Sequence, residues 1–161
     1  MSILIKNGTI VTSVNEYKAD VLIEGEKIVA IGTGLEGRAD QVVDASGKYV
    51  IPGGVDEHLH YNSFNSLGYE TSDAAAAGGT TTVGDFVVQP KGVGLKDSII
   101  NYKKEAVAGK AMVDYVLHGI IMDPTDQSFK DIPSMPEVGV ASVKLFMAYK
   151  GMDYYATDDS I

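Results

Sequence analysis

Short apolar runs separated by glycine-containing turns occupy the first fifty residues of the chain. Three pairs of such runs follow one another, each divided by a dipeptide that ends in glycine: 3–11 around Asn7-Gly8, 20–32 around Glu24-Gly25, and 42–50 around Ser46-Gly47. Apolar runs that flank a pair such as Asn-Gly are typical of β-hairpins. The pattern therefore predicts three hairpins in a small, mostly antiparallel β module.

From about residue 52 the pattern changes to longer apolar runs that alternate with helical segments. We expect strands at about 50–60, 80–88, 112–122 and 140–149, and helices at 73–77, 95–110 and 129–139, with a fourth helix beginning near Thr157. Strands that alternate with helices are typical of parallel βα units, and nearly continuous apolar strands are typical of strands buried on both faces.

The sequence therefore predicts an α/β protein with two regions, a β module at 1–51 and a set of βα units at 52–161. Four βα units are about half of a TIM-like (β/α)8 barrel, which needs roughly 250 residues. We expect the second region to be the first half of such a barrel. A complete small α/β sheet is the alternative.

Composition and charge exclude several classes of partner. The chain has 161 residues, of which 45% are hydrophobic and 22% charged, as in soluble globular proteins. Its formal net charge of −9 argues against nucleic acid and anionic membrane surfaces as partners, because both attract clustered basic residues. The absence of cysteine excludes disulfides and thiolate metal sites. Without a membrane-spanning apolar stretch or a secretory signal, we expect a cytoplasmic location.

Two histidines lie at the end of the first predicted barrel strand. Alternate residues of a strand point to the same side, so His58 and His60 should project together towards the barrel interior at its carboxyl end, where barrel enzymes build their sites. Two imidazoles on one side suit zinc or another borderline divalent metal. A bare His-x-His also arises as two incidental histidines; the apolar strand, the 52–54 Pro-Gly-Gly entry and Asp56 favour the metal site.

Lys144 lies inside the apolar run at 141–150. A lysine in an apolar strand is unfavourable unless its charge is paired or removed. If Lys144 faces the barrel interior, its uncharged amine can react with carbon dioxide to give a carbamate, an anionic oxygen ligand that can bridge two cations. A lysine at a strand end that reaches water is the alternative.

Three segments, in order, resemble the dihydropyrimidinase/D-hydantoinase family of the amidohydrolase superfamily: PGGVDEHLH at 52–60, GGTTT at 78–82 and VKLFMAYKG at 143–151. The resemblance covers nearly the whole chain, and the third segment is the most specific. It implies that residues 1–51 fold as a β-sandwich module. It also implies that the chain is the N-terminal portion of such an enzyme and ends before the active site is complete.

The resemblance also implies the roles of individual residues. His58 and His60 would bind the more buried of two divalent metal ions, expected to be zinc, and Lys144, carboxylated by CO2, would bridge the pair. Tyr149 corresponds to the family tyrosine that holds the substrate and stabilises the developing oxyanion. In this family a metal-bridging hydroxide attacks a ring carbonyl of a dihydropyrimidine or hydantoin and opens the cyclic amide. The remaining ligands, two histidines and an aspartate, come from later strands, so this chain alone is expected to be inactive.

Related functions remain open. Allantoinases and dihydroorotases place an arginine shortly after the second histidine, whereas His60 is followed by Tyr61-Asn62 and the only arginine is Arg38. A neutral small-molecule ring therefore fits better than a carboxylate-bearing one. A non-catalytic, dihydropyrimidinase-related assembly protein and a self-contained binding domain are also compatible with the sequence. The family resemblance suggests a homotetramer.

Two further polar residues lie on predicted strands. His118 is a metal-ligand candidate by residue type, but the implied ligand set does not need it, which favours a structural role. Asp85 lies on the second barrel strand and is a candidate hydrogen-bonding group beside the ligands. The sequence assigns it no role.

Overall fold

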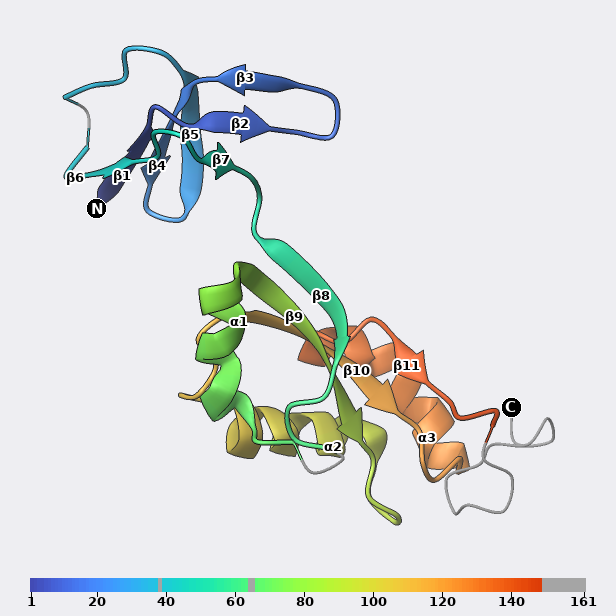
Figure 1. Ribbon diagram of the computed structural model, residues 1–161. Coiled ribbons are helices and arrows are strands. Elements are labelled where there is room, and N and C mark those ends of the chain that lie inside the picture. The colour runs from blue at the N-terminus through green and yellow to red at the C-terminus, as the bar shows by residue number, and fades with distance from the viewer. Residues whose placement is uncertain (38, 64–65, 149–161) are drawn as a thin grey trace. The chain divides into compact units, whose positions relative to one another are not determined.

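The computed structural model describes residues 1–37, 39–63 and 66–148 (Figure 1). The chain divides into two compact units, Met1–Pro52 and a second that begins at Gly53. Within the described residues, no helix is both long enough and apolar enough to cross a membrane.

The first unit consists of two small β-sheets with the strand orders β5-β4-β1-β6 and β3-β2-β7. Its strands are β1 (Ser2–Lys6), β2 (Thr9–Val11), β3 (Glu16–Lys18), β4 (Asp20–Glu24), β5 (Lys27–Gly32), β6 (Gln41–Asp44) and β7 (Tyr49–Val50). Ile10, Ala19 and Val21 form a buried apolar cluster, and Leu4, Leu22 and Ala45 are also buried. Antiparallel pairing predominates, as predicted, although β6 and β7 each pair in parallel with an earlier strand.

Of the three predicted hairpins, the middle one is confirmed and the outer two are wrong. β4 and β5 pair antiparallel across a turn in which Gly25 has a φ of +61°. By contrast, β1 pairs with β4 and β6, while β2 pairs with β3 and β7. The segments at Asn7-Gly8 and Ser46-Gly47 therefore carry the chain from one sheet to the other. Turn residues specify that the chain reverses, but not which strand becomes the partner.

Asp44 holds one of these crossings together. Its carboxylate accepts hydrogen bonds from the Ser46 hydroxyl at 2.6 Å, the Ser46 N–H at 3.0 Å and the Asn7 side-chain amide at 2.9 Å. These bonds, the Ser46 hydroxyl first among them, lower the pKa of Asp44 from 3.8 to about 2. Because the pKa in the folded protein is depressed, the stabilisation is complete above pH 3.8 and is lost as the pH falls through about 2.

We therefore expect an NMR titration of the Asp44 carboxyl carbon to have its midpoint at about 2. In Ser46→Ala the midpoint should rise towards 3.8, because the largest cause of the depressed pKa is gone. Ser13→Ala, outside this network, should leave the midpoint unchanged. A midpoint near 3.8 in the unaltered protein would contradict the hydrogen bonding described.

The second unit is an α/β structure built on four parallel strands in the order β11-β10-β9-β8 (Figure 1). The strands are β8 (Gly54–Leu59), β9 (Thr80–Val88), β10 (Asp114–Ile120) and β11 (Val143–Lys144). The helices are α1 (Ser72–Gly78), α2 (Leu95–Tyr102) and α3 (Asp126–Asp131), with 3-10 helices at Tyr69–Thr71 and Ile132–Val138 and a π-helical turn at Lys103–Val107. Strand order follows chain order, which gives a partial half-barrel.

The predicted βα pattern matches these elements, with differences at their ends. β9 has the predicted bounds, whereas β8, β10 and, within the described residues, β11 are shorter than predicted. The predicted helix at 95–110 ends as an α-helix at Tyr102, and the third helix begins at Asp126 and continues as a 3-10 helix that contains Pro136. Proline lacks the N–H that an α-helix interior requires, which explains why the third helix continues as a 3-10 helix. The predicted fourth helix lies outside the described residues.

One face of this sheet is covered by helices. Val87 and Leu117 pack with Leu95 and Ile99 of α2 in a buried cluster, and the complete burial of Leu95 and Ile99 contributes about 1.5–3 kcal/mol for each side chain. Gly119 pairs with Val87 and would place a Cβ against Leu95. Odd-numbered residues of β9 and β10 therefore face the helices, and even-numbered residues face the opposite side of the sheet.

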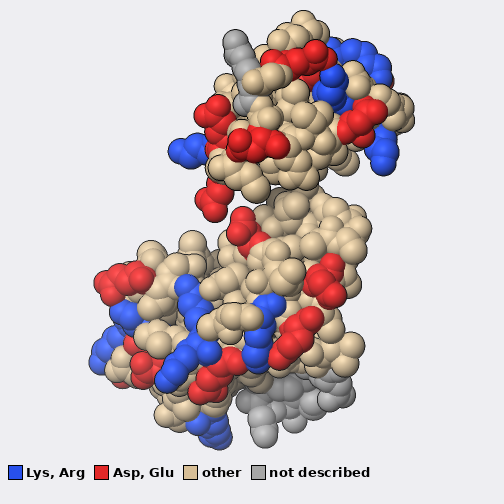
Figure 2. Space-filling model, turned by 90° about the vertical axis from the view of Figure 1, so that its left-hand side faces the viewer, with Lys and Arg blue, Asp and Glu red and all other residues tan. Residues whose placement is uncertain are grey.

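Acidic and basic side chains are interspersed on the face that Figure 2 shows, in both units, and are not gathered into a patch of one sign. Ion pairs such as Lys110 with Glu70, at 3.0 Å, and Lys96 with Glu137, at 2.6 Å, lie between partly exposed side chains. Exposed pairs of this kind contribute about 0–1 kcal/mol each, so the fold depends chiefly on its apolar cores.

Candidate functional site

The side chains of His58, His60 and Lys144 gather around the ring of Phe86. The centroid of the Phe86 ring lies 4.4 Å from that of His58 and 5.3 Å from that of His60, and the two imidazole centroids are 5.3 Å apart. Lys144 Nζ lies 4.4 Å from the Phe86 centroid. The three residues predicted to hold metal therefore come from the two edges of the described sheet and meet over β9. Their role as ligands stays a prediction.

These side chains also lie at one end of the sheet. His60 directly follows β8, Phe86 is three residues from the start of the next loop, and Lys144 is the last residue of β11. Because all four strands are parallel, their carboxyl ends meet at the same edge. In barrel enzymes this is the edge at which active sites are built.

His118 joins the same cluster. It pairs with Phe86 across the sheet, and the two rings stack with centroids 4.8 Å apart and an interplanar angle of 28°. His118 Nδ1 is hydrogen-bonded to the hydroxyl of Ser142, just before β11. These contacts link β9, β10 and the approach to β11, which fits the structural role that the sequence favoured, while placing His118 next to the candidate ligands.

The electrostatics of the cluster favour a neutral imidazole at His60. Partial burial, followed by the charges of Lys144 and His58, holds the pKa of His60 below its ordinary value of 6.5, and Asp85 acts in the opposite direction. The Ser63 hydroxyl lies 3.0 Å from Nδ1 of the His60 imidazole. Neutral imidazole is the form that binds metal ions, and a hydrogen bond at one ring nitrogen orients the other.

Asp85 lies on the opposite, helix-facing side of β9 and is fully buried. Its carboxylate accepts hydrogen bonds from the Tyr102 hydroxyl at 2.5 Å, the Phe86 N–H at 2.8 Å and the Tyr61 N–H at 3.2 Å. Tyr61 follows His60 directly, and Tyr102 ends α2. Asp85 thus ties the end of β8 to β9 and to a helix, directly beneath the candidate site.

A second buried tyrosine, Tyr69, borders this carboxylate. Burial raises the pKa of both Tyr69 and Tyr102, and the interaction with Asp85 raises both further. The Tyr102 hydroxyl donates to Asp85, whereas the buried Tyr69 hydroxyl has no hydrogen-bond partner in the described part of the chain. The two hydroxyls therefore offer a matched pair for testing what a bond to Asp85 contributes.

Comparison with known proteins extends over the whole chain. It is 44% identical over 159 residues to a D-hydantoinase of Rhizobium radiobacter, covering 95% of this chain and 34% of the relative. A D-hydantoinase structure has a TM-score of 0.88 at 41% identity, and a dihydropyrimidinase structure from Brevibacillus agri has a TM-score of 0.89 at 38% identity; each match covers 99% of this chain and 36% of the other. The chain belongs to the dihydropyrimidinase/D-hydantoinase family. No protein-family model matches it.

The chain spans about a third of the length of the family members it matches. The resemblance seen in the three sequence segments is thereby confirmed, together with the α/β fold.

The donor set suits a metal site of this family only in part. Within the described residues, no three histidine, aspartate or glutamate side chains are gathered closely enough to hold a metal ion. The candidate set consists of two imidazoles and one amine, and an ammonium group repels cations. His58 and His60 fit a divalent metal as they stand, whereas Lys144 fits only if its amine is modified. Tyr149, the predicted substrate-binding residue, lies outside the described residues.

Phe86 is the contact residue that sequence reasoning missed in this hydantoinase-like site. Its ring contacts all three histidines and lies under Lys144. The alternation of β9 carried the signal, because Phe86 occupies the strand face opposite Asp85 near the carboxyl end. The alternation identifies Phe86 as a contact of the histidines only when the pairing of β9 with β8 and β10 is known.

Proposed function

We propose that the protein is a metal-dependent hydrolase that opens cyclic amides, namely dihydropyrimidine or hydantoin rings, and that this chain supplies part of its active site. The observation that carries the proposal is the convergence of His58, His60 and Lys144 on the Phe86 ring at the carboxyl ends of parallel strands. The names of its relatives, D-hydantoinase and dihydropyrimidinase, support the same reaction class.

His58 and His60 would hold one divalent cation, zinc being the ion expected, and Lys144 would share it with a second. The proximity of the two imidazole rings, 5.3 Å between centroids, supports a common ion. The chemistry that such cations would supply when bound is the activation of a water molecule and the polarisation of the ring carbonyl. The lowered pKa of His60 keeps its imidazole in the form that binds the cation.

Lys144 is proposed to act as a carbamate formed with CO2. In the part of the chain that the structure describes, its amine takes part in no ion pair and contacts the rings of Phe86 and Phe146, 4.4 and 4.9 Å from their centroids. As a cation it would oppose metal binding beside His58 and His60. Conversion to a carbamate exchanges a positive charge for a negative one and supplies two oxygen donors, which turns repulsion into attraction.

Tyr149 is proposed to hold the substrate and to donate a hydrogen bond to the oxyanion that develops on the attacked carbonyl. A positioned donor of this kind is worth about a hundredfold to a thousandfold in rate. Arg38 is the only arginine of the chain, and no arginine follows His60, where allantoinases and dihydroorotases place theirs. This supports a neutral ring such as dihydrouracil or a substituted hydantoin over a dihydroorotate-like substrate.

The finer features of the fold are proposed on the same basis. We propose that residues 1–51 form a β-sandwich module, that residues 52–161 contribute to a (β/α)8 barrel, and that the assembled protein is a homotetramer. The serial order of β8 to β11 supports the barrel. Size-exclusion chromatography with light scattering on the protein from the complete reading frame would test the tetramer.

The function is tested by metal analysis and ring-opening assays on the protein from the complete reading frame. We expect about two metal ions per chain and hydrolysis of dihydrouracil, a hydantoin or both. Chelation should abolish the activity and added zinc should restore it. A protein that binds no metal and opens neither ring would refute the proposal and favour a non-catalytic, assembly-type relative.

A further inference from the structure

The pairing of β8 with β9 shifts register twice. β9 has one extra residue between the pairs Gly54–Thr80 and Val55–Thr82, and the second shift lies where the histidines are. Asp56 pairs with Val83, and the next pair is Leu59 with Asp85. Three steps along β8 therefore match two steps along β9, so β8 contains one extra residue in the stretch occupied by Glu57 and His58. An extra residue of this kind is a β-bulge, which changes the facing of the residues that follow it.

The bulge determines which side of the sheet the histidines face. Val83 and Asp85 both lie on the helix-facing side of β9, so their partners Asp56 and Leu59 share that side. His58 and His60 flank Leu59 and therefore face the opposite side, towards Phe86. If β8 continued regularly from Asp56, residues 58 and 60 would share the side of Asp56 and point towards the helices. The extra residue of β8 reverses the alternation set by Asp56 and returns the strand to the register of Gly54 with Thr80.

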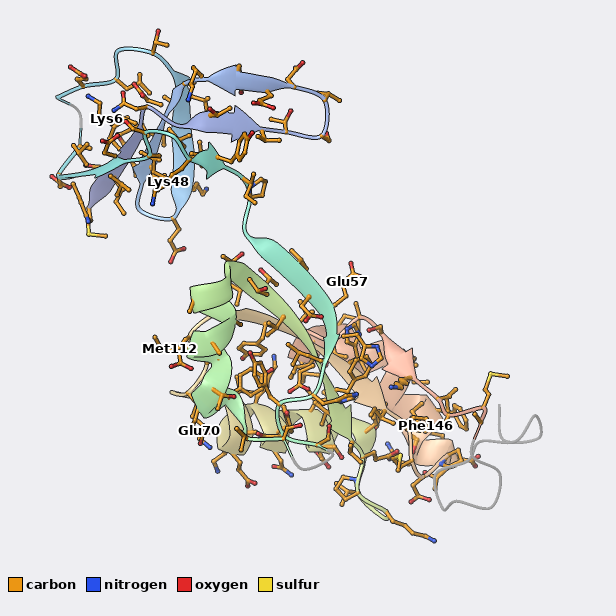
Figure 3. The ribbon with its side chains drawn as sticks, viewed as in Figure 1. Lys6, Lys48, Glu57, Glu70, Met112 and Phe146 are labelled. Carbon is orange, nitrogen blue, oxygen red and sulfur yellow. The ribbon has the colours of Figure 1, made fainter. Side chains whose placement is uncertain are left out.

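Gly84 is the residue of β9 that lies against this bulge. A Cβ at position 84 would be 2.6 Å from the carbonyl oxygen of Glu57, 2.8 Å from its carbonyl carbon and 3.1 Å from its Cα. All three neighbours are backbone atoms, which cannot rotate away as a side chain would. The Glu57 side chain itself projects from β8 on the side away from α1 (Figure 3). The close approach is therefore between two backbones, which only glycine permits.

We propose that Gly84 is a positioning residue for the metal site: the absence of a side chain at position 84 admits the extra residue of β8 that turns His58 and His60 towards Phe86 and Lys144. The effect on metal binding rests on the proposed function, whereas the effect of Gly84 on the facing of the two histidines does not. Asp85 complements Gly84, because its bond from the Tyr61 N–H fixes the strand just beyond the bulge.

The test compares Gly84→Ala with Gly119→Ala in the protein from the complete reading frame. Gly119 is also a buried strand glycine, but its Cβ would meet the side-chain ends of Leu95 and Met135, at 3.1 and 3.4 Å, on the helix-facing side. Two quantities are measured: the zinc content, and the imidazole C–H resonances of the apoprotein, which report the position of each ring relative to Phe86. The resonances are assigned from single histidine-to-asparagine variants.

In Gly84→Ala we expect the His58 and His60 resonances to move and the zinc affinity to fall at least about tenfold, since misplaced ligands bind poorly. The His118 resonance should change little, because its stacking on Phe86 is separate from the bulge. Gly119→Ala should retain both the histidine positions and the zinc. Unchanged His58 and His60 resonances in Gly84→Ala would overturn the inference. If the unaltered protein binds no zinc, the proposed function fails, while the resonances still decide the role of Gly84.

A second variant covers the case in which Gly84→Ala does not fold. Deleting Glu57 removes the extra residue, so that Asp56 and Leu59 are separated by two steps, as their partners on β9 are. Alanine at position 84 then faces a regular strand. Combining the Glu57 deletion with Gly84→Ala should restore folding and place the two histidine rings beside Phe86. Failure of the combined variant to recover either property would overturn the inference.

Discussion

Replacing Lys144 with alanine is expected to remove most of the bound metal. It should also lower the ring-opening activity of the complete protein by at least about a hundredfold. As a carbamate, Lys144 would contribute both oxygen donors that join the two cations. Alanine leaves His58 and His60 in place beside Phe86, with no anionic donor opposite them among the described residues. Metal content by elemental analysis and initial rates with dihydrouracil and a hydantoin would measure the two losses.

The control for this prediction is Lys104→Ala, which removes an exposed lysine far along the chain from the candidate site. It should retain metal and activity. A native mass spectrum of the unaltered protein should show the added mass of one CO2, which Lys144→Ala should lack. Full metal content and full activity in Lys144→Ala would contradict the carbamate assignment, and the lysine would then be a strand-end residue that reaches water.

The sequence predicted the barrel-like unit well because its signals are long and repeated. β9 extends over nine residues rich in β-branched side chains, and its predicted and observed bounds coincide. The placement of His58, His60 and Lys144 at one edge of the sheet also follows from strand order and parallel direction, which a βα rhythm specifies without knowledge of contacts. Residues that share an edge of the sheet are thus the most predictable part of the site.

What the sequence did not predict depends on pairing between segments that are distant in the chain. The Asn7-Gly8 turn has hairpin chemistry, yet β1 and β2 join different sheets, because the choice of partner is made by the packing of Ile10 and its neighbours. The bulge of β8 is likewise invisible in the sequence, since it exists only relative to the register of β9. Strict alternation gave His58 and His60 a common side, whereas the expected barrel, and not the alternation, assigned that side to the interior.

The buried carboxylate beneath the site leads to a prediction about stability. Asp85 is fully buried and accepts bonds from the hydroxyl of Tyr102 and the N–H groups of Tyr61 and Phe86. Replacing Asp85 with alanine leaves all three donors without an acceptor in a site closed to water. Because unsatisfied buried groups lose their full solvation, we expect the free energy of unfolding to fall by about 3–5 kcal/mol, a large part of the roughly 5–15 kcal/mol that holds a protein folded.

The neighbouring tyrosines separate a hydrogen-bonding effect from a loss of packing. Tyr102→Phe removes the hydroxyl that donates to Asp85 and should lower the free energy of unfolding by about 1.5–3 kcal/mol, as expected for a bond to a charged acceptor. Tyr69→Phe removes a buried hydroxyl that has no partner among the described residues, so its effect should stay within about 0.5 kcal/mol or be stabilising. Urea denaturation of the three variants gives these values. Equal losses for Tyr69→Phe and Tyr102→Phe would contradict a specific contribution of the bond between Tyr102 and Asp85.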